Sequence, residues 1–436
     1  MKAFGWFDSL PLKWSRRRLK YAAKLSNTRT DGRPDGARYL GLENVESCTG
    51  RVLESVATSR NAEDAVGADS VVNCFDRGDV LFGKLRPYLA KAHLAQHSGV
   101  CTTELLVMKP QPEINGKFLL YTLLNDGFIS LVNSSTFGSK MPRADWDFIG
   151  GVNVPVPPSA EQRAIADFLD RETGRLDALM AAKEQWLELL AQKRRALITR
   201  AVTRGLNPKV PLQDSGMDWL GHVPKHWRVE RLKFHLHKIE QGWSPQCENY
   251  PAEKEHWGVM KAGCVNGWEF NPNENKRLPD DLEPPLEYEI KSGDVLMSRA
   301  NTTELLGSTA LVRKVRPRLL LCDKLYRLDV DQTQMDKEYL VAFLRASAGR
   351  YQFERDATGA SNSMQNIGQD SVRNVWVAVP PTLDEQRTIA NYISTEASKL
   401  DALRAATERT LELLRERRAA LIAAAVTGEI KTPQLA

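Results

Sequence analysis

Apolar residues recur at alternating spacings of three and four along two long stretches of the chain, residues 154–206 and 377–430. This spacing is typical of an amphipathic helix with one apolar stripe. About 45 helical residues, at ~1.5 Å each, would make each helix about 65 Å long. The positions expected on the stripes are Ile165, Leu169, Leu176, Leu179, Trp186, Leu190 and Leu197 in the first helix, and Ile389, Ile393, Leu400, Leu403, Leu414 and Leu421 in the second.

Residues that suit helix ends flank both stretches. Each opens with two prolines and then a serine or threonine, at residues 157–159 and 380–382. A glutamine or glutamate follows three residues later, as in a capping box. Gly205 and Gly428 stand at the far ends, where a C-terminal cap is expected.

The two stretches are copies of one another. Their motifs align at a constant offset, since 385 − 161 = 224, and this offset places the LDAL of residues 176–179 on that of residues 400–403. A fainter match, Trp6-x3-Leu10-Pro11-x2-Trp14 with Trp219-x3-Val223-Pro224-x2-Trp227, has an offset of 213. A third, the GDVL of residues 78–81 and 293–296, has an offset of 215. The chain is therefore a tandem duplication in which a variable part and a helix occur twice.

A long helix with one apolar stripe needs a partner, and the other copy is the nearest candidate. Antiparallel pairing would relate the two halves by a pseudo-two-fold axis. A symmetric reader with two heads, spaced by a ruler, would suit duplex DNA. The alternative is two independent helices, each lying on its own domain, but a domain of ~150 residues is only about 30–40 Å across and such a helix would overhang it.

The parts that precede the helices contain short apolar runs bounded by turn residues, at residues 79–82, 104–108, 294–297 and 325–328. Each part also has a shorter helical stretch, and this mixture predicts domains with mixed sheets. The predicted fold class is α+β, with two mixed α/β domains joined by two long helices that pair as an antiparallel coiled coil. The predicted boundaries are 1–153 and 207–376 for the domains, and 154–206 and 377–436 for the helices.

Basic and hydrogen-bonding residues cluster in two loops of each variable part. Arginine and lysine suit guanine edges and phosphates, asparagine and glutamine suit adenine, and serine or threonine serve either. Ordinary solvated loops are the alternative for any single residue, whereas the clusters as sets favour DNA contact. The candidates are Lys84, Arg86, Tyr88, Lys91, Ser139, Lys140 and Arg143 in the first part, and Arg299, Asn301, Thr302, Thr303, Ser361, Asn362, Ser363, Gln365 and Asn366 in the second.

Composition adds limits rather than a function. The 436 residues are 42% hydrophobic and 26% charged, with a formal net charge of +5, which permits nucleic-acid binding without requiring it. The sequence shows neither a membrane-spanning run nor the apolar core of a signal peptide, so we expect a cytoplasmic protein with no membrane contact. The six cysteines form no CxxC pair and are expected to be reduced. A zinc site of Cys247, His256 and Cys264 is conceivable, but its spacing matches no usual pattern.

The sequence offers little catalytic chemistry. It contains no Asn/Asp-Pro-Pro-Tyr/Phe methyltransferase motif and no Walker A loop, so a non-catalytic chain is expected. Asp280, Glu289 and Lys291 match a loose PD…ExK nuclease pattern that could hold Mg²⁺. They lie in an acidic, proline-rich run whose counterpart in the first half lacks the acids, which favours a chance match.

The segments PPSAEQRAIADFLD…LDAL and PPTLDEQRTIANYI…LDAL resemble the conserved regions of type I restriction–modification specificity subunits, and so do GDVLFGKLRPYLAKA and GDVLMSRANTTELLG. The resemblance covers essentially the whole chain. It implies that each variable part is a target-recognition domain for one half of a split, asymmetric site in double-stranded DNA. The helices would set the spacer and dock two modification subunits.

The same resemblance assigns the cofactors to partner chains. Modification subunits would use S-adenosylmethionine to methylate adenine, and restriction subunits would supply ATP-driven translocation and a Mg²⁺-dependent nuclease. This chain would bind none of these cofactors. Two other classes remain: a coiled-coil scaffold with two protein-binding heads, which would show no salt-dependent DNA affinity, and a self-contained endonuclease, which would cleave plasmid alone with Mg²⁺.

Overall fold

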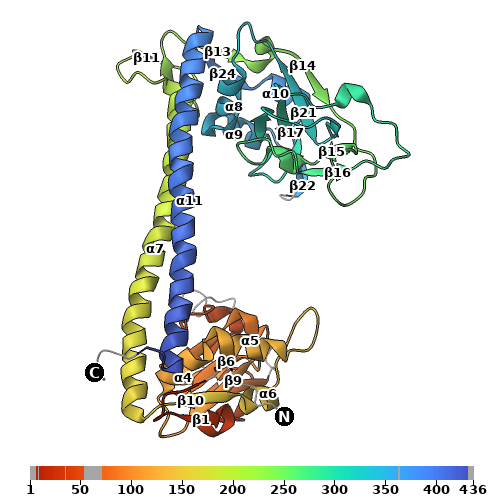
Figure 1. The fold of residues 1–436 in the computed structure, drawn as a ribbon. Coiled ribbons are helices and arrows are strands. Elements are labelled where there is room, and N and C mark those ends of the chain that lie inside the picture. The colour runs from red at the N-terminus through yellow and green to blue at the C-terminus, as the bar shows by residue number, and fades with distance from the viewer. Residues whose placement is uncertain (1–5, 8, 35, 54–70, 362–363, 431–436) are drawn as a thin grey trace. The chain divides into compact units, whose positions relative to one another are not determined.

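The computed structural model describes residues 6–430 except 8, 35, 54–70 and 362–363. The chain divides into two compact units. Unit 1 comprises Met1–Glu184 with Glu408–Ala436, and unit 2 comprises Gln185–Thr407. Each unit contains one mixed α/β domain and a segment of each of the two long helices, α7 (Ser159–Arg204) and α11 (Leu383–Thr427) (Figure 1).

In its described residues, the domain of unit 1 contains two four-stranded sheets and one strand pair. In sheet order these are β2 (Ala23–Leu25), β9 (Leu105–Pro110), β6 (Val80–Gly83) and β7 (Ala92–Leu94); β3 (Arg29–Asp31), β5 (Val71–Phe75), β8 (Gly99–Cys101) and β4 (Tyr39–Leu40); and β1 (Ser15–Arg18) with β10 (Asn153–Val156). All pairs are antiparallel except β4 with β8. Alternation along β6 directs Val80 and Phe82 into one buried cluster and Leu81 into another, so this strand is buried on both faces.

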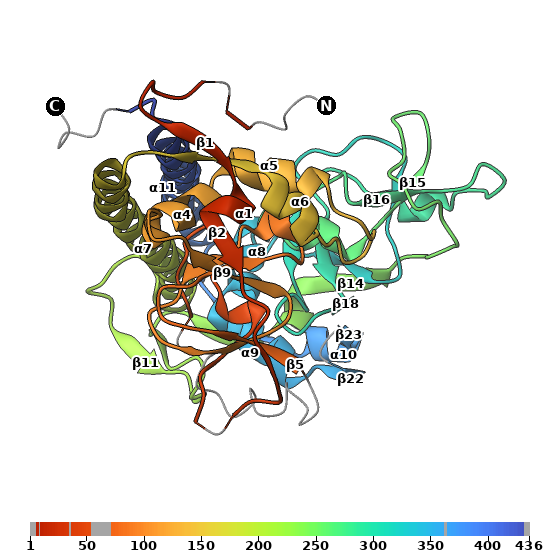
Figure 2. The same cartoon turned by 90° about the horizontal axis from the view of Figure 1, so that it is seen from below.

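Helices α1 (Leu19–Ala22), α4 (Gly116–Leu123), α5 (Asp126–Ser134) and α6 (Trp146–Gly151) contribute to the first of these clusters. Asn115 caps α4, because its side chain accepts hydrogen bonds from the amides of Lys117 and Phe118. Phe118 and Tyr121 on the other face of α4 pack against Ile165 and Leu169 of α7. Figure 2 shows α4 beside α7 in unit 1.

Unit 2 repeats this plan with additions. Its sheets are β14 (Leu236–Gln241), β21 (Leu325–Val330), β17 (Val295–Ser298) and β19 (Thr309–Leu311); β16 (Asn275–Arg277), β15 (Gly258–Met260) and β20 (Leu319–Leu320); β18 (Ala300–Asn301), β23 (Met364–Asn366) and β22 (Thr358–Ser361); β13 (Arg228–Arg231) with β24 (Trp376–Val379); and β11 (Leu212–Asp214) with β12 (His222–Pro224). The helices are α8 (Lys337–Arg345), α9 (Ser347–Arg355) and α10 (Gln369–Arg373). Val295 and Met297 enter one buried cluster and Leu296 another, as in β6 of unit 1.

The repeated GDVL motif forms the same turn in both units. Gly78 and Gly293 both have φ of +93°, a left-handed conformation that favours glycine. The aspartate that follows each glycine closes the turn: Oδ2 of Asp79 accepts from the amide of Asp76 at 2.8 Å, and Oδ2 of Asp294 accepts from the amide of Lys291 at 2.9 Å. The motif thus sets the entry into β6 and β17.

The glutamine of the repeated EQR motif joins each long helix to its domain. Oε1 of Gln162 accepts from the amide of Asn115 at 2.7 Å, and its Nε2 donates to the carbonyls of Glu113 and Pro157. In unit 2, Oε1 of Gln386 accepts from the amide of Asp336 at 2.7 Å. Its Nε2 donates to the carbonyls of Gln334 and Pro380. Both amide groups are buried, so each makes a fully bonded bridge between the long helix and the start of a short one.

The glutamate before each glutamine binds a tryptophan of the fainter repeat. Nε1 of Trp14 donates to Glu161 at 2.7 Å, and Nε1 of Trp227 donates to Glu385 at 2.9 Å. The capping bond expected from Ser159 is absent among the described residues, since the amide of Gln162 donates to the carbonyl of Pro158 at 3.0 Å, while Oγ of Ser159 donates to the carbonyl of Glu113. In the second copy the expected cap is present, since Oγ1 of Thr382 accepts from the amide of Glu385 at 3.3 Å.

Within each unit, the helix segments run antiparallel, as predicted. In unit 1, Ile165 and Leu169 near the start of α7 pack with Ile422 and Val426 near the end of α11. In unit 2 the roles exchange, and the start of α11 packs with the end of α7. Of the residues predicted on the stripes, those that are buried are Ile165, Leu169, Leu176, Leu190, Ile389, Ile393, Leu400 and Leu414, while Leu197 and Leu421 are half-buried.

Three of the predicted stripe residues depart from the prediction. Leu179, Trp186 and Leu403 are 44%, 47% and 50% exposed, so they do not lie in the buried seam. An α-helix turns every 3.6 residues, so a strict 3.5-residue repeat drifts by ~20° per heptad across its surface. Thr173 and Thr407 are buried polar residues of the long helices, and each hydroxyl donates to a carbonyl four residues earlier in its own helix. The hydroxyl of Thr173 also lies 3.2 Å from that of Tyr121 in α4.

The glycines after the long helices make equivalent contacts. Gly205 (φ +67°) and Gly428 (φ +80°) are both left-handed, as a C-terminal cap requires. A Cβ placed on Gly205 would lie 3.3 Å from the indole of Trp227, and one on Gly428 would lie 3.2 Å from that of Trp14 and 2.5 Å from Cγ of Pro11. Each helix therefore ends against a Pro-x-x-Trp segment of its own unit.

Candidate nucleic-acid interface

The two candidate loops of unit 1 meet beside the end of β6. Leu85 forms an isolated antiparallel bridge with Arg143, and the amide of Arg86 donates to the carbonyl of Pro142 at 2.7 Å. The amide of Ala144 donates to the carbonyl of Lys84 at 3.0 Å. The structure thus brings together two segments that are more than forty residues apart in the sequence, 84–91 and 137–143.

The first of these loops has an unusual backbone. Arg86 (φ +50°) and Ala90 (φ +47°) are left-handed residues on either side of a single 3₁₀ turn, Pro87–Leu89. Left-handed conformations are uncommon for residues with a Cβ and are concentrated at functional sites. Arg86 and Tyr88 are exposed in this turn.

The exposed surface of this loop pair is both basic and apolar. Among the described residues, Lys84, Arg86 and Lys140 take part in no ion pair, and Ser139 lies exposed beside Lys140. Phe137 and Met141 are also exposed, although the sequence analysis did not select them. The sequence does hold a signal for these two residues, because they are apolar side chains within a loop rich in serine and glycine. Apolar side chains in such loops can contact bases or insert between them.

Two predicted DNA contacts of unit 1 have partners inside the domain. Nζ of Lys91 donates to the carbonyl of Leu42 at 2.7 Å, and partial burial lowers the pKa of this ammonium group. The guanidinium of Arg143 forms an ion pair with Glu104 at 3.1 Å, which raises the pKa of Arg143. The sequence could not show that these side chains have partners within the domain, and DNA contact by Lys91 and Arg143 stays a prediction.

The two candidate loops of unit 2 form a small sheet. β18 pairs with β23, so that Ala300 lies opposite Asn366 and Asn301 opposite Gln365, and β23 pairs in turn with β22. Arg299 precedes β18, Thr302 and Thr303 follow it, and the backbone of Ser361 ends β22. Asn362 and Ser363 lie outside the described residues. As in unit 1, a loop that follows the GDVL strand is joined to a later loop of the same domain.

The polar side chains of this sheet are more enclosed than those of unit 1. Nδ2 of Asn301 donates to Oδ1 of Asn266 at 2.9 Å, and Gln365 is mostly buried. Arg299 lies beside the phenol of Tyr326, whose pKa is raised by burial and lowered in part by this guanidinium. Direct base contact by Gln365 through its side chain would therefore require a change of conformation.

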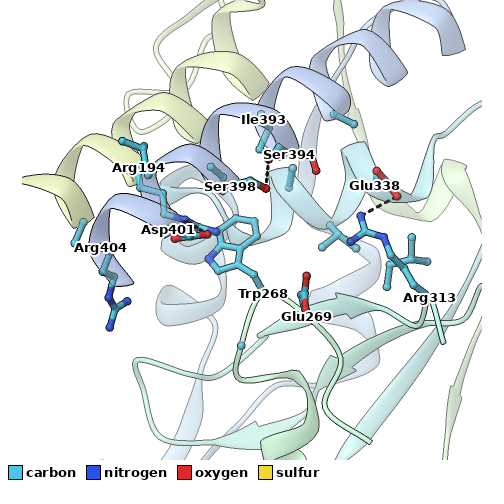
Figure 3. A pocket seen from close by; sticks show the side chains of 18 of the residues that line it. Arg194, Trp268, Glu269, Arg313, Glu338, Ile393, Ser394, Ser398, Asp401 and Arg404 are labelled. Atoms are coloured by element: carbon cyan, nitrogen blue, oxygen red, sulfur yellow. Dashed lines mark hydrogen bonds and ion pairs between the residues drawn. The ribbon is translucent and has the colours of Figure 1, made fainter. Parts of the chain in front are cut away.

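Unit 2 also contains a cavity of about 650 Å³ between α7, α8, α11 and the loop at residues 267–269 (Figure 3). Arg194 pairs with Asp401 at 3.1 Å, and Arg313 pairs with Glu338 at 2.9 Å. The guanidinium of Arg194 also lies 4.3 Å from the centre of the Trp268 ring. None of the predicted DNA contacts lines this cavity.

The described residues contain no group of three or more His, Cys, Asp or Glu side chains arranged to hold a metal ion. All six cysteines are free thiols. Asp280 of the nuclease-like pattern pairs with Arg277, and Glu289 accepts a hydrogen bond from the amide of Arg318. In the part of the chain that the structure describes, no helix is long and apolar enough to span a membrane.

Comparison with known proteins agrees with this picture. Residues 58–189 match the model of the type I restriction modification DNA specificity domain. The chain is 24% identical to the type I restriction enzyme EcoEI specificity subunit of Escherichia coli, over 72% of this chain and 67% of that protein. It is 22% identical to the EcoKI specificity subunit of E. coli strain K12, over 74% and 68% of the two chains.

Solved structures share the fold. A chain from a type I R-M system, determined in work on complex assembly and conformational transition, superposes with a TM-score of 0.71 at 19% identity and covers 97% of this chain and 100% of that one. The HsdS subunit of Thermoanaerobacter tengcongensis superposes with a TM-score of 0.52 at 20% identity, over 97% and 99%. The chain therefore has the fold of these solved structures, and residues 58–189 are similar to the type I restriction modification DNA specificity domain. The resemblance seen in the sequence is thereby confirmed: the chain carries that specificity domain and is similar over most of its length to specificity subunits.

Proposed function

We propose that this chain selects the DNA sequence on which a type I restriction–modification complex acts, and that each domain reads one half of a split site. The observation that carries the proposal is that both units join the loop after the GDVL strand to a later loop, by the Leu85–Arg143 bridge in unit 1 and by β18 and β23 in unit 2. Two unlike loop surfaces on one duplicated frame suit an asymmetric site with two different halves.

The long helices are proposed to set the spacer between the half-sites and to dock two modification subunits. Support for docking comes from exposed leucines that recur at the repeat offset, since 179 + 224 = 403 and 189 + 224 = 413. Leu179, Leu189, Leu403 and Leu413 are all exposed large apolar residues. Each unit therefore presents two exposed leucines, Leu179 and Leu413 in unit 1 and Leu403 and Leu189 in unit 2. Equivalent exposed leucines in the two units suit two copies of one partner.

The chain is proposed to be non-catalytic within this complex. S-adenosylmethionine would be bound by the modification subunits, and ATP and Mg²⁺ by restriction subunits. The charge of only +5 fits a subunit whose partners supply much of the contact with the DNA backbone.

Methylome sequencing tests this proposal. The chain would be expressed with its modification subunits in a host that lacks other methyltransferases. We expect one split, asymmetric motif with methylated adenine in each half. Replacing residues 1–153 by the first domain of a relative should change one half and leave the other intact. Methylation independent of this chain would contradict the proposal, and plasmid cleavage by the chain alone with Mg²⁺ would favour a nuclease.

A further inference from the structure

Two arginines of unit 2 reach from helices to the backbone of the candidate DNA-contact loop after β18 or of the segment beside it. Arg345 is the last residue of α8, and Arg350 lies in α9. Neither was selected from the sequence, because neither lies in a loop or a motif. Their guanidinium groups are bonded mainly to backbone carbonyls that lie far away in the sequence.

Arg345 donates to four carbonyl groups, three in the segment 265–267 and one at the start of β19. Its Nη1 group donates to Val265 at 2.9 Å, to Gly267 at 2.6 Å and to Thr309 at 2.9 Å. Its Nη2 group donates to Asn266 at 2.9 Å. A planar guanidinium can hold several acceptors in fixed directions, whereas a lysine ammonium or a glutamine amide offers fewer donors.

The loop held by Arg345 orients a candidate base contact. Asn266, whose carbonyl Arg345 binds, accepts at Oδ1 from Nδ2 of Asn301 at 2.9 Å. Oδ1 of Asn301 accepts in turn from the amide of Thr302 at 2.9 Å. These two bonds fix which end of the Asn301 amide donates and which accepts. That orientation decides which base edge an asparagine can read.

Arg350 binds the loop between β18 and β19, which carries Thr302 and Thr303. It donates to the carbonyl of Leu306 and to that of Thr303, the latter at 2.9 Å. Thr303 is itself a candidate contact. The segment that runs from β18 to β19 is thus held at both of its ends by arginines from the two helices.

These arginines are half-buried. Partial burial lowers the pKa of Arg345 to about 10, so this guanidinium stays protonated at neutral pH, and partial burial also lowers the pKa of Arg350. Among the described residues Arg345 has no carboxylate partner, and its guanidinium lies 4.7 Å from the centre of the Trp268 ring. Removing a guanidinium from water without a carboxylate partner costs free energy, whereas an apolar side chain could pack at this position without losing hydration.

We infer that Arg345 and Arg350 are positioning residues that set base selection in the half-site read by unit 2, through the loop network of Asn266, Asn301 and Thr303. This inference rests on the proposed function, since it requires that unit 2 reads DNA. It adds residues behind the reading surface that touch no base and yet determine which bases the surface accepts.

The test is selection from a randomised DNA duplex library by the complex of this chain with its modification subunits. The variants are Arg345→Gln, Arg350→Gln and Asn266→Ala. The matched control is Arg355→Gln, because Arg355 is an exposed arginine of α9 that pairs with the neighbouring Asp356. Thermal unfolding of each complex shows whether the variant is folded. The half-site read by unit 1 is an internal control in every selection.

We expect Arg345→Gln and Asn266→Ala to lose roughly tenfold in discrimination at the same base positions of the unit 2 half-site. The unit 1 half-site and the Arg355→Gln selection should match those of the original chain. Unchanged base preferences in folded Asn266→Ala, or equal relaxation of both halves, would overturn the inference. If Arg345→Gln does not fold, Asn266→Ala decides alone. If the original chain selects no split motif, the proposed function itself fails.

Discussion

Arg418 donates from Nε to Oδ1 of Asp177 at 2.9 Å, and about nine-tenths of each side chain is buried. The repeat offset of 224 relates Arg418 to Arg194 and Asp177 to Asp401, since 418 − 224 = 194 and 177 + 224 = 401. These counterparts also form an ion pair, at 3.1 Å. Each arginine also meets the domain of its own unit: Arg418 donates to the carbonyl of Cys48, and Arg194 lies over the Trp268 ring. The duplicated sequence therefore reproduces one helix-to-domain junction in both units.

The two ion pairs should differ in their effect on stability. Asp177→Ala leaves the buried charge of Arg418 without its partner, so we expect the free energy of unfolding to fall by about 3–5 kcal/mol. Asp401 is 52% exposed, and Asp401→Ala should cost no more than ~1 kcal/mol. Urea denaturation of the two variants measures both values. Equal losses would show that burial does not control the strength of this junction.

The glutamine bridges should be intolerant of a carboxylate. Gln162→Glu replaces two N–H donors by oxygen, which places an acceptor against the carbonyls of Glu113 and Pro157. We expect each of Gln162→Glu and Gln386→Glu to lower the free energy of unfolding by about 2–4 kcal/mol. The neighbouring exposed Arg163→Gln is the control. The bridge assignment does not survive if control and variants unfold at the same urea concentration.

Unit 2 should lose stability in mild acid. The His235 side chain is fully buried, with Nε2 3.1 Å from Glu230, and burial lowers its pKa below the ordinary value of 6.5. The unfolded chain then binds more protons than the folded chain between these two pKa values. The contribution of neutral His235 to stability is complete above pH 6.5 and is lost as the pH falls through the lower pKa of the folded protein. We expect the unfolding temperature to fall between pH 7.5 and 5.5, and less so in His235→Gln; an identical pH profile for the two proteins would rule out His235 as the cause.

Charge in the loops of unit 1 should control the salt dependence of DNA binding. Arg86→Ala and Lys140→Ala should each weaken binding and reduce the slope of log Kobs against log salt by up to about 1. Lys109→Ala is the control, because that lysine lies in β9 and pairs with Asp76 at 2.9 Å. Fluorescence anisotropy of the complex at several salt concentrations measures the slopes. If the slope for Lys109→Ala falls as much as the slopes for the loop variants, Arg86 and Lys140 cannot be assigned as specific DNA contacts.

Longer helices should change the spacer without changing the half-sites. One heptad inserted after Gln185 and one after its counterpart Arg409, since 185 + 224 = 409, adds about 10 Å of helix while keeping the seam in register. This length corresponds to roughly three base pairs of rise. Methylome sequencing should report the original half-sites at a longer separation. An unchanged spacer would refute the role of the helices as a ruler.

The long helices were predictable because their information is local and repeated. A stripe at three- and four-residue spacings needs no knowledge of tertiary structure, although the drift of the stripe that exposes Leu179 and Leu403 appears only in three dimensions. The loops were found by composition, but the bonds that fix Lys91 to Leu42 and Arg143 to Glu104 depend on partners tens of residues away. Arg345 shows the same limit most clearly, because its acceptors lie 36 to 80 positions away along the chain.

The contacts of the two capping glycines bear on how the chain could be connected. Gly205 contacts Pro224 and Trp227, and residues 206–223 connect the glycine to them. Gly428 makes the same contacts with Pro11 and Trp14, to which it is not connected by a following segment of the given sequence. The two helix ends thus make equivalent contacts, whether or not the chain runs directly from the glycine to the Pro-x-x-Trp segment. A circular permutant joined between Gly428 and Pro11 and opened between Gly205 and Pro224 would preserve both sets of contacts, with the domains exchanged in gene order.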